Sequence, residues 1–140
     1  MDLTNTVIIV NFKTPGLTVD CIKSLQSSGA LNPSQISLID NHSMDHSVSE
    51  IEAHISAMEL HNSVSLHESP INGGFSAGNN IGIKKASSKY VLLLNSDTLV
   101  RPGAIELLVK TLEDNPEIGM ASPRLKQLSC GLSVGRCLRI

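Results

Sequence analysis

The chain has 140 residues, of which 41% are hydrophobic and 17% charged, so it has the length of one domain or a piece of one and is too apolar for a disordered protein. Aromatic residues make up only 2%, which argues against binding that relies on aromatic stacking. Residues 1–117 hold all thirteen acidic side chains, while residues 118–140 hold four basic ones. Because no basic stripe runs along residues 1–117, we expect no nucleic-acid partner.

The cysteines and the apolar runs of the sequence indicate in which cellular compartment the protein is expected. The three cysteines, Cys21, Cys130 and Cys137, are odd in number and widely spaced, which is not the pattern of a disulfide framework or a zinc site. The apolar run near the start is too short for a signal-peptide core, and no other run approaches the ~20 apolar residues of a membrane span. We therefore expect no membrane span and a cytoplasmic protein, with the inner face of the membrane as an alternative place.

The first half of the chain repeats a strand and a helix. Residues 6–11 form a β-branched apolar run that predicts a strand buried on both faces. Apolar residues at helical spacing then predict a helix over 16–28. A second strand is expected at 36–39, followed by a helix over 47–58 that opens with a capping box from Ser47 to Glu50.

The second half continues this alternation less regularly. A weaker strand is expected at 64–67, and the glycine- and asparagine-rich stretch 72–82 runs into a helix that ends near Ser88. Residues 90–94 have the composition of the central strand. Pro102 is expected in the first turn of a fourth helix that stops at 114–116.

A last short strand is expected at 118–121, after which no period is visible. Strands that alternate with helices predict an α/β fold with a doubly wound, mainly parallel sheet. We expect residues 1–127 to form this domain, with 128–140 as an irregular basic tail.

Polar residues collect where the predicted strands end. In open α/β sheets the ligand lies beyond the carboxyl ends of the strands, and the four strands are followed by Asn11, 40–45, 72–74 and 95–97. Each group alone could be a turn former or a helix cap. Together they suit a ribose, a base edge and a metal-bound phosphate. Glycine and asparagine at 78–82 cost up to ~1 kcal/mol each inside a helix, so a contact or close approach should offset them.

Several catalytic and ligand-binding motifs are incomplete in this sequence. Gly74 to Gly78 match G-x-S-x-G, but all five histidines precede Ser76, whereas a hydrolase places its histidine after the serine. Neither the dinucleotide fingerprint nor the phosphate-binding loop with its lysine is present. His42 and His46 are four residues apart and could share a helix face, yet no third metal ligand is evident.

Four motifs in this order resemble the nucleotide-sugar-binding half of the family 2 glycosyltransferases, most closely the bacterial rhamnosyltransferase-type members that build cell-surface polysaccharide. The resemblance covers about residues 5–127 and rests on Val7-Ile8-Ile9-Val10-Asn11-Phe12, Ile39-Asp40-Asn41-His42-Ser43-Met44-Asp45, the stretch from Asn72 to Gly82, and Leu92-Leu93-Leu94-Asn95-Ser96-Asp97.

The resemblance implies a GT-A fold and inverting transfer of a sugar to the hydroxyl of a saccharide or lipid-linked acceptor. The donor would be a UDP- or dTDP-sugar, dTDP-rhamnose for the rhamnosyltransferase type, with Mg²⁺ or Mn²⁺ as cofactor. By position, Asp40 would accept the pyrimidine N3–H, Asn95 would bond the ribose and Asp97 would hold the metal. The full set expected to bind the nucleotide sugar is Val10, Asn11, Asp40, Asn41, Ser43, Asn72, Gly73, Gly74, Phe75, Asn79, Asn95 and Ser96.

The chain also departs from the family. Asn95 stands where the D-x-D motif has an acid, and no acidic residue follows Glu117, although the longer family members supply the general base from their second half. We therefore expect a truncated or frame-shifted gene product that holds the donor-binding half, with no identifiable catalytic residue. A noncatalytic nucleotide-binding remnant is the alternative. A receiver domain is disfavoured, since the third strand ends in Glu68-Ser69-Pro70 rather than in a phosphorylatable aspartate.

Overall fold

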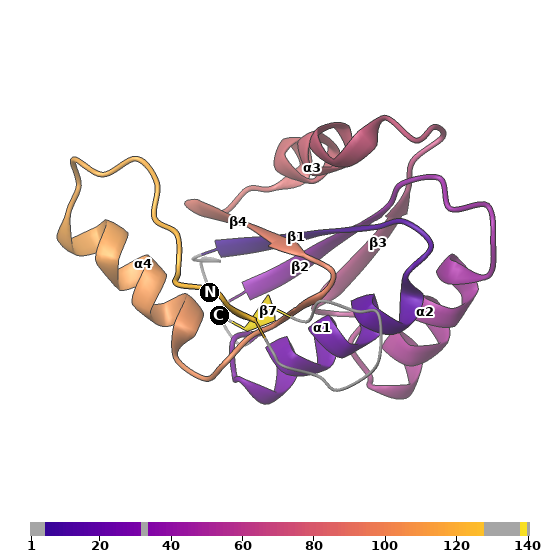
Figure 1. The fold of residues 1–140 in the computed structure, drawn as a ribbon, viewed down its shortest axis with the longest axis horizontal. Helices are drawn as coiled ribbons and strands as arrows, with labels where there is room; N and C mark the ends of the chain where they lie inside the picture. Colours follow the sequence, from indigo (N-terminus) through magenta and orange to yellow (C-terminus); the bar gives the residue numbers. More distant parts are fainter. Residues whose placement is uncertain (1–4, 32–33, 128–137, 140) are drawn as a thin grey trace.

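The computed structural model describes residues 5–31, 34–127 and 138–139. Helices and strands alternate through most of this range (Figure 1). In chain order the elements are β1 (Asn5–Asn11), α1 (Pro15–Ser27), β2 (Ser34–Asp40), α2 (Ser47–Ala57), β3 (Val64–Glu68), α3 (Gly74–Lys85), β4 (Tyr90–Asn95), β5 (Thr98–Leu99), α4 (Ala104–Asp114), β6 (Lys126–Gln127) and β7 (Leu138–Arg139).

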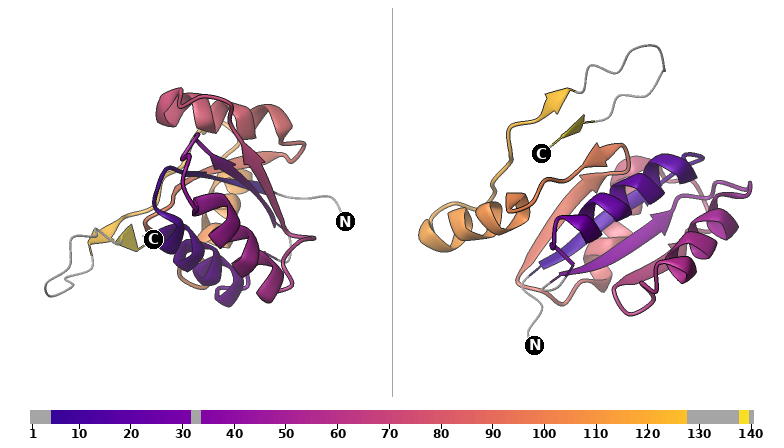
Figure 2. Two further views of the ribbon diagram at one scale, coloured as in Figure 1. Left: turned by 90° about the vertical axis from the view of Figure 1, so that its right-hand side faces the viewer. Right: turned by 90° about the horizontal axis from the view of Figure 1, so that it is seen from below.

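The main sheet is parallel and has helices on both faces. Its strand order is β3-β2-β1-β4, and every neighbouring pair runs in the same direction. Helix α3 covers one face over β1 and β2, while α1 and α2 lie on the other face (Figures 1 and 2). The carboxyl ends of β1 and β2 are in register, with Asn11 paired to Asp40. The predicted doubly wound α/β fold is confirmed.

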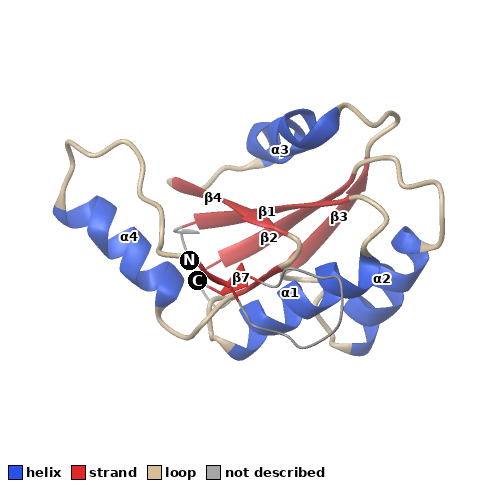
Figure 3. Ribbon diagram, in the orientation of Figure 1, coloured by secondary structure: helices blue, strands red, loops and turns tan. Residues whose placement is uncertain are grey.

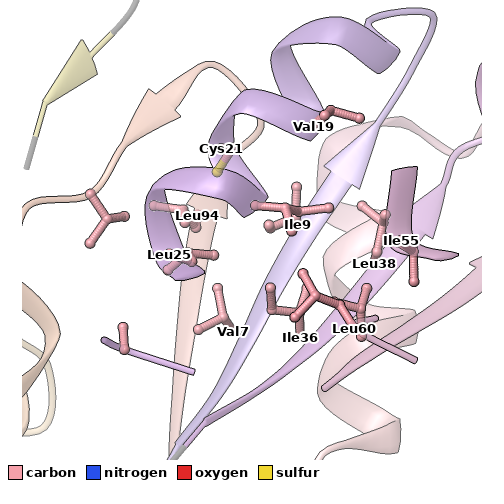
Figure 4. Close-up of a cluster of buried hydrophobic side chains, with 14 of the residues drawn as sticks. Val7, Ile9, Val19, Cys21, Leu25, Ile36, Leu38, Ile55, Leu60 and Leu94 are labelled. Carbon is pink, nitrogen blue, oxygen red and sulfur yellow. The ribbon is translucent and has the colours of Figure 1, made fainter. Parts of the chain in front are cut away.

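The hydrophobic core lies between the sheet and helices α1 and α2 (Figure 4). All seven residues of β1 are buried, as the β-branched run predicts for a strand inside a parallel sheet. Val7 and Ile9 belong to this core together with Leu25 of α1 and Ile55 of α2. Ile8 and Val10 alternate to the opposite face and lie under α3. The core thus holds β1 in place from both sides.

The element predictions were confirmed with local corrections. The capping box was wrong, because α2 begins at Ser47 with His46 as its N-cap, and it is Asp45 Oδ1 that accepts a hydrogen bond from the Ser47 N–H at 2.8 Å. Pro102 lies in the turn before α4, which begins two residues later, after Gly103. Helix α3 begins at Gly74 and ends at Lys85, before Ser88.

The predictions near the end of the chain were less accurate (Figure 3). Residues 118–121 form no strand, and β4, expected at the centre, is one of the two outer strands of the main sheet in the described part of the chain. The second sheet, with strand order β5-β7-β6, was not predicted. Residues 128–137 and 140 of the expected tail lie outside the described residues. Among the residues that are described, no helix has both the length and the apolar character to cross a bilayer.

Candidate functional site

A cavity of about 310 Å³ opens at the carboxyl ends of β1, β2 and β4. This strand-end cavity lies where parallel α/β sheets place their ligands, and its volume reaches the lower end of the ~300 to 1,000 Å³ typical of small-molecule sites. No Asp, Glu or His of the described part of the chain is among the residues that line it. The lining is formed by Val10, Phe12, Thr14, Asn41, Asn72, Gly74, Phe75 and Ser96.

A buried hydrogen-bond network centred on Asp40 lies beside this cavity. The carboxylate is only 2% exposed. Its Oδ1 accepts hydrogen bonds from Asn11 Nδ2 at 2.7 Å and Ser43 Oγ at 2.6 Å, and its Oδ2 accepts the Ser43 N–H at 2.9 Å. Thr18 of α1 completes the network by donating to Asn11 Oδ1 at 2.8 Å. Buried polar groups that are satisfied in this way hold loops in a single arrangement.

The network fixes two loops that contain left-handed backbone. Lys13 after β1 has φ 57°, while His42 and Met44 after β2 have φ 62° and 54°. Such values are uncommon for residues other than glycine and persist where surrounding contacts hold them. Ser43 supplies that contact, since its Oγ accepts the Lys13 N–H at 3.0 Å. The loops after β1 and β2 are therefore fixed relative to each other.

Asn41 connects the loop after β2 to the start of α3. Its Nδ2 donates to Asn72 Oδ1 at 2.8 Å and to the Gly74 carbonyl at 3.2 Å. Asn72 Oδ1 also accepts the Gly74 N–H at 2.9 Å. Asn41 is 3% exposed, and its Oδ1 has no hydrogen-bond partner among the described residues. Asn41, which lines the cavity, therefore carries a buried acceptor, Oδ1, and the two bonds from Nδ2 set the orientation of its amide.

The glycine-rich stretch lies within α3 and brings that helix close to the sheet. A Cβ at Gly78 would lie 2.8 Å from Val10 Cγ1, and one at Gly82 would lie 2.6 Å from Ile8 Cγ2. The expected close approach is confirmed at both glycines. Asn79 is also buried, and its Nδ2 donates to the Phe75 carbonyl at 2.9 Å. Close packing of α3 on β1 sets the position of Gly74 and Phe75 in the cavity wall.

The last group of predicted site residues, 95–97, follows β4. Ser96 lines the strand-end cavity, while Asn95 is exposed and Asp97 is half-buried in the turn before β5. Asp97 makes no hydrogen bond or ion pair with another residue in the described part of the chain. Across the same residues, no three His, Cys, Asp or Glu side chains gather into a metal site. Asp97 is thus a single carboxylate next to a cavity-lining residue.

The structure brings most of the predicted residues to one edge of the sheet. Val10, Asn41, Asn72, Gly74, Phe75 and Ser96 line the cavity. Asn11, Asp40 and Ser43 form the network beside it. Gly73 is the N-cap of α3, and Asn79, Asn95 and Asp97 are not part of the lining.

Phe12, Thr14 and Thr18 were not predicted from the sequence as parts of the site. Thr18 could have been found, because it is a polar residue on the buried face of α1. His42 and His46 do not share a helix face, since α2 begins after both. Ser76 is exposed inside α3 and does not form a strand-to-helix elbow.

Comparison with known proteins agrees with this architecture. The family model described as Glycosyl transferase family 2 matches residues 6–132. An uncharacterized protein of Sinorhizobium fredii, y4gI, is 29% identical over 115 residues, which are 82% of this chain and 12% of that protein.

Two of the solved structures that share the fold are a mannosyltransferase and S. aureus TarS. The mannosyltransferase PcManGT from Pyrobaculum calidifontis, in complex with GDP-Man and Mn²⁺, superposes with a TM-score of 0.72 at 18% identity over 82% of this chain and 34% of that one. S. aureus TarS 1-349 in complex with UDP gives 0.68 at 15% identity over 89% and 38%. The chain thus spans little more than a third of each of these two solved structures. It belongs to glycosyl transferase family 2.

Proposed function

We propose that this member of glycosyl transferase family 2 is the donor-binding part of an inverting glycosyltransferase that moves a sugar from a nucleoside diphosphate to an acceptor hydroxyl. The observation that carries the proposal is the strand-end cavity, whose wall joins the loops after β1, β2 and β4 to the start of α3. Its mixture of amide, hydroxyl and apolar groups suits a nucleoside. Similar folds bind GDP-Man in PcManGT and UDP in TarS.

Asn41 is the residue we propose for recognising the base. It lines the cavity and holds an unpartnered buried Oδ1, while its Nδ2 is already engaged. A buried acceptor without a donor costs ~1 to 3 kcal/mol, so a ligand that brings an N–H is favoured there. Uracil and thymine present N3–H, whereas cytosine has an acceptor at N3. This supports a UDP- or dTDP-linked donor, including the dTDP-rhamnose suggested by the family resemblance.

Asp40 is proposed to act chiefly through its neighbours. Its carboxylate does not line the cavity, and it holds Asn11 and Ser43 in the buried network. Direct pairing of Asp40 with the base, as the resemblance suggests, would use a remaining lone pair on Oδ2. Because Asn41 lines the cavity and Asp40 does not, Asn41 is the better placed of the two.

A divalent metal fits the chemistry at Asp97. Mg²⁺ in nucleotide sites is commonly held by one or two carboxylates together with substrate phosphates and waters, and Asp97 offers a carboxylate with no partner among the described residues. Neutral Asn95 would contribute a hydrogen bond to the ribose rather than a charge. Bound Mg²⁺ or Mn²⁺ would neutralise charge on the departing diphosphate.

The described residues offer no candidate for the general base at the strand-end cavity, since none of its described lining residues is a carboxylate or a histidine. An inverting transfer requires a group that accepts the proton of the attacking hydroxyl. We therefore propose that residues beyond this region supply the base and the contacts to a saccharide or lipid-linked acceptor. The same observation favours a second candidate, a noncatalytic nucleotide-binding module.

Calorimetry with nucleoside diphosphates tests the proposal. We expect UDP and dTDP to bind more tightly than CDP, and tighter still with MnCl₂. Asn41→Ala should weaken UDP binding by ~2- to 12-fold, the equivalent of one hydrogen bond. Asn80→Ala is the matched control, because Asn80 is an exposed amide on α3 that does not line the cavity.

A second variant tests the metal assignment. Asp97→Ala should remove the effect of Mn²⁺ on UDP binding without removing binding itself. If no nucleoside diphosphate binds, with or without metal, the donor site is refuted. Binding without sugar transfer by the protein that includes the adjoining region would favour the noncatalytic module.

A further inference from the structure

A second cavity, of about 70 Å³, lies on the face of the sheet that α3 covers. Thr6 belongs to this face because it alternates with Val7 of the core and shares the side of Ile8, which meets Gly82 of α3. Ser37 pairs with Ile8 on one side and with Ser65 on the other. The lining of this sheet-face cavity is Thr6, Gln35, Ile36, Ser37, Ser65, His67, Lys85 and Ser87.

The sheet-face cavity is separate from the strand-end cavity. Ser37 precedes Asn41 by four residues along β2, which corresponds to ~13 Å in an extended strand. The two cavities share no lining residue. A ligand in the sheet-face cavity would therefore bind independently of the proposed donor.

Ser37 supplies the lining of this cavity with a hydrogen-bonding group that has no protein partner among the described residues. The residue is 6% exposed, and its Oγ has no hydrogen-bond partner among the described residues. An unsatisfied buried hydroxyl is costly, and native structures usually pair it with protein, water or a ligand. The volume exceeds what one water needs, so a small polar molecule has room beside Ser37.

The charge of the cavity indicates the chemistry of that molecule. Among the described residues, His67 and Lys85 are the titratable groups that line it, and no carboxylate does. Burial, with a smaller contribution from the Lys85 ammonium, lowers the pKa of the His67 imidazole. Lys85 forms no ion pair with any residue in the described part of the chain. Two basic groups thus face several hydroxyls without a counter-ion.

We propose that the sheet-face cavity binds a tetrahedral oxyanion, either inorganic or the phosphate of a phosphomonoester, between the β1–β3 face and the end of α3. The anion would accept hydrogen bonds from Ser37 Oγ and from the exposed hydroxyls of Ser65 and Ser87. Lys85 and protonated His67 would balance its charge, since hydrogen bonds from ionised donors are the stronger ones.

Titration with sodium sulfate, followed by NMR of the histidine ring protons, tests this proposal. Sulfate keeps its charge between pH 5.5 and 8, so any change in affinity reports on the protein. A bound anion favours the imidazolium and raises the pKa of His67, so binding should be tighter at pH 5.5 than at pH 8. His67→Gln identifies the resonance. Glycerol 3-phosphate, compared with inorganic phosphate, shows which source of the oxyanion is preferred.

Lysine variants distinguish a specific oxyanion site from a general effect of positive charge on sulfate binding. Lys85→Gln should weaken sulfate binding by about tenfold or more. Lys84→Gln is the matched control, because Lys84 lies in the same last turn of α3 but does not line the cavity. Ser37→Ala removes the unpartnered hydroxyl and should weaken binding several-fold while the protein stays folded.

Three results would overturn the proposal. One is a His67 resonance that does not respond to sulfate at pH 5.5. Another is an equal response to sodium chloride at matched ionic strength. The third is an equal loss of affinity in the two lysine variants, which would assign the effect to charge at the helix end. None of these results depends on nucleotide binding, so the oxyanion site and the proposed function can fail separately.

Discussion

Replacing Gly82 by alanine tests how closely α3 packs on the sheet. The added Cβ would lie 2.6 Å from Ile8 Cγ2 and 3.0 Å from both Ile8 Cγ1 and Cδ1. Ile8 is fully buried on β1, and Cγ2 is attached directly to its Cβ, so the side chain cannot turn its far end away from the clash. Relief requires α3 or β1 to shift.

Two opposing effects set the magnitude. Alanine in place of glycine stabilises a helix interior by ~1 kcal/mol, whereas overpacking a core costs ~1 to 3 kcal/mol. We expect Gly82→Ala to lower the free energy of unfolding by ~1 kcal/mol, within a range from about zero to ~2. Gly16→Ala is the matched control in α1, since a Cβ there would meet no atom within 4 Å. That variant should be neutral or stabilised by up to ~1 kcal/mol.

Urea unfolding monitored by circular dichroism measures both variants, and calorimetry with UDP measures the effect on the site. Because α3 carries Gly74 and Phe75 of the strand-end cavity, a displaced helix should also weaken UDP binding in Gly82→Ala but not in Gly16→Ala. A Gly82→Ala protein at least as stable as Gly16→Ala would show that the helix does not pack as closely as the structure indicates.

Other predictions concern the buried network, pH and turnover. Asp40→Ala leaves buried donors of Asn11 and Ser43 without their acceptor, so urea unfolding should show a loss of ~2 to 5 kcal/mol. The control Asp20→Ala, at an exposed position on α1, should lose less than ~1 kcal/mol, and equal losses would contradict the network. The pKa of His67 is lowered from 6.5 by burial, so near that pH the unfolded chain binds more protons than the folded one, and stability should fall as pH decreases from about 7 through the folded pKa. His67→Gln should flatten this part of the stability curve, and an unchanged slope would assign the proton uptake to another group. The 140-residue chain should show no multiple turnovers with radiolabelled UDP- or dTDP-sugars and cell-envelope acceptor, because general-base help typically contributes ~100- to 10,000-fold; ordinary enzymatic rates would mean that a base has been overlooked.

Local patterns were sufficient to predict the layers of the fold. The β-branched run of β1 indicates a strand covered on both faces, and the structure buries all seven of its residues. Helix α1 follows directly from apolar residues at helical spacing. Glycines at 78 and 82 predicted a close approach because their cost in a helix needs compensation, and Val10 and Ile8 are the partners.

These local patterns did not indicate which strands pair with each other in the sheet. Strand β4 has a fully apolar centre, yet it lies at the outside of the main sheet, with Val91 and Leu93 38% and 49% exposed. Pairing partners, rather than composition, decide whether a strand is central. The same reason explains the second sheet, because strands of two residues such as β5 and β7 are too short to show a period.

At the candidate site, the sequence could not predict the different positions of two adjacent residues. Asp40 and Asn41 both follow β2 and were both expected to bind the nucleotide, with Asp40 assigned to the base through the family resemblance. In the structure the backbone of this loop turns through left-handed residues at His42 and Met44. That path allows Ser43 to bond back to Asp40, while Asn41 is left in the cavity wall. Side-chain chemistry alone does not predict this division.

Because Asp40 belongs to the buried network and Asn41 lines the cavity, substitutions of these two residues should affect protein stability and nucleotide binding separately. Asp40 has its contacts inside the protein, so its loss should appear mainly in unfolding. Asn41 keeps its two Nδ2 bonds and an Oδ1 without a partner among the described residues, and Asn41→Ala removes that acceptor. If Asn41 recognises the base through Oδ1, Asn41→Ala should reduce the preference for UDP over CDP more than Asp40→Asn does. The reverse ranking would return the base contact to Asp40.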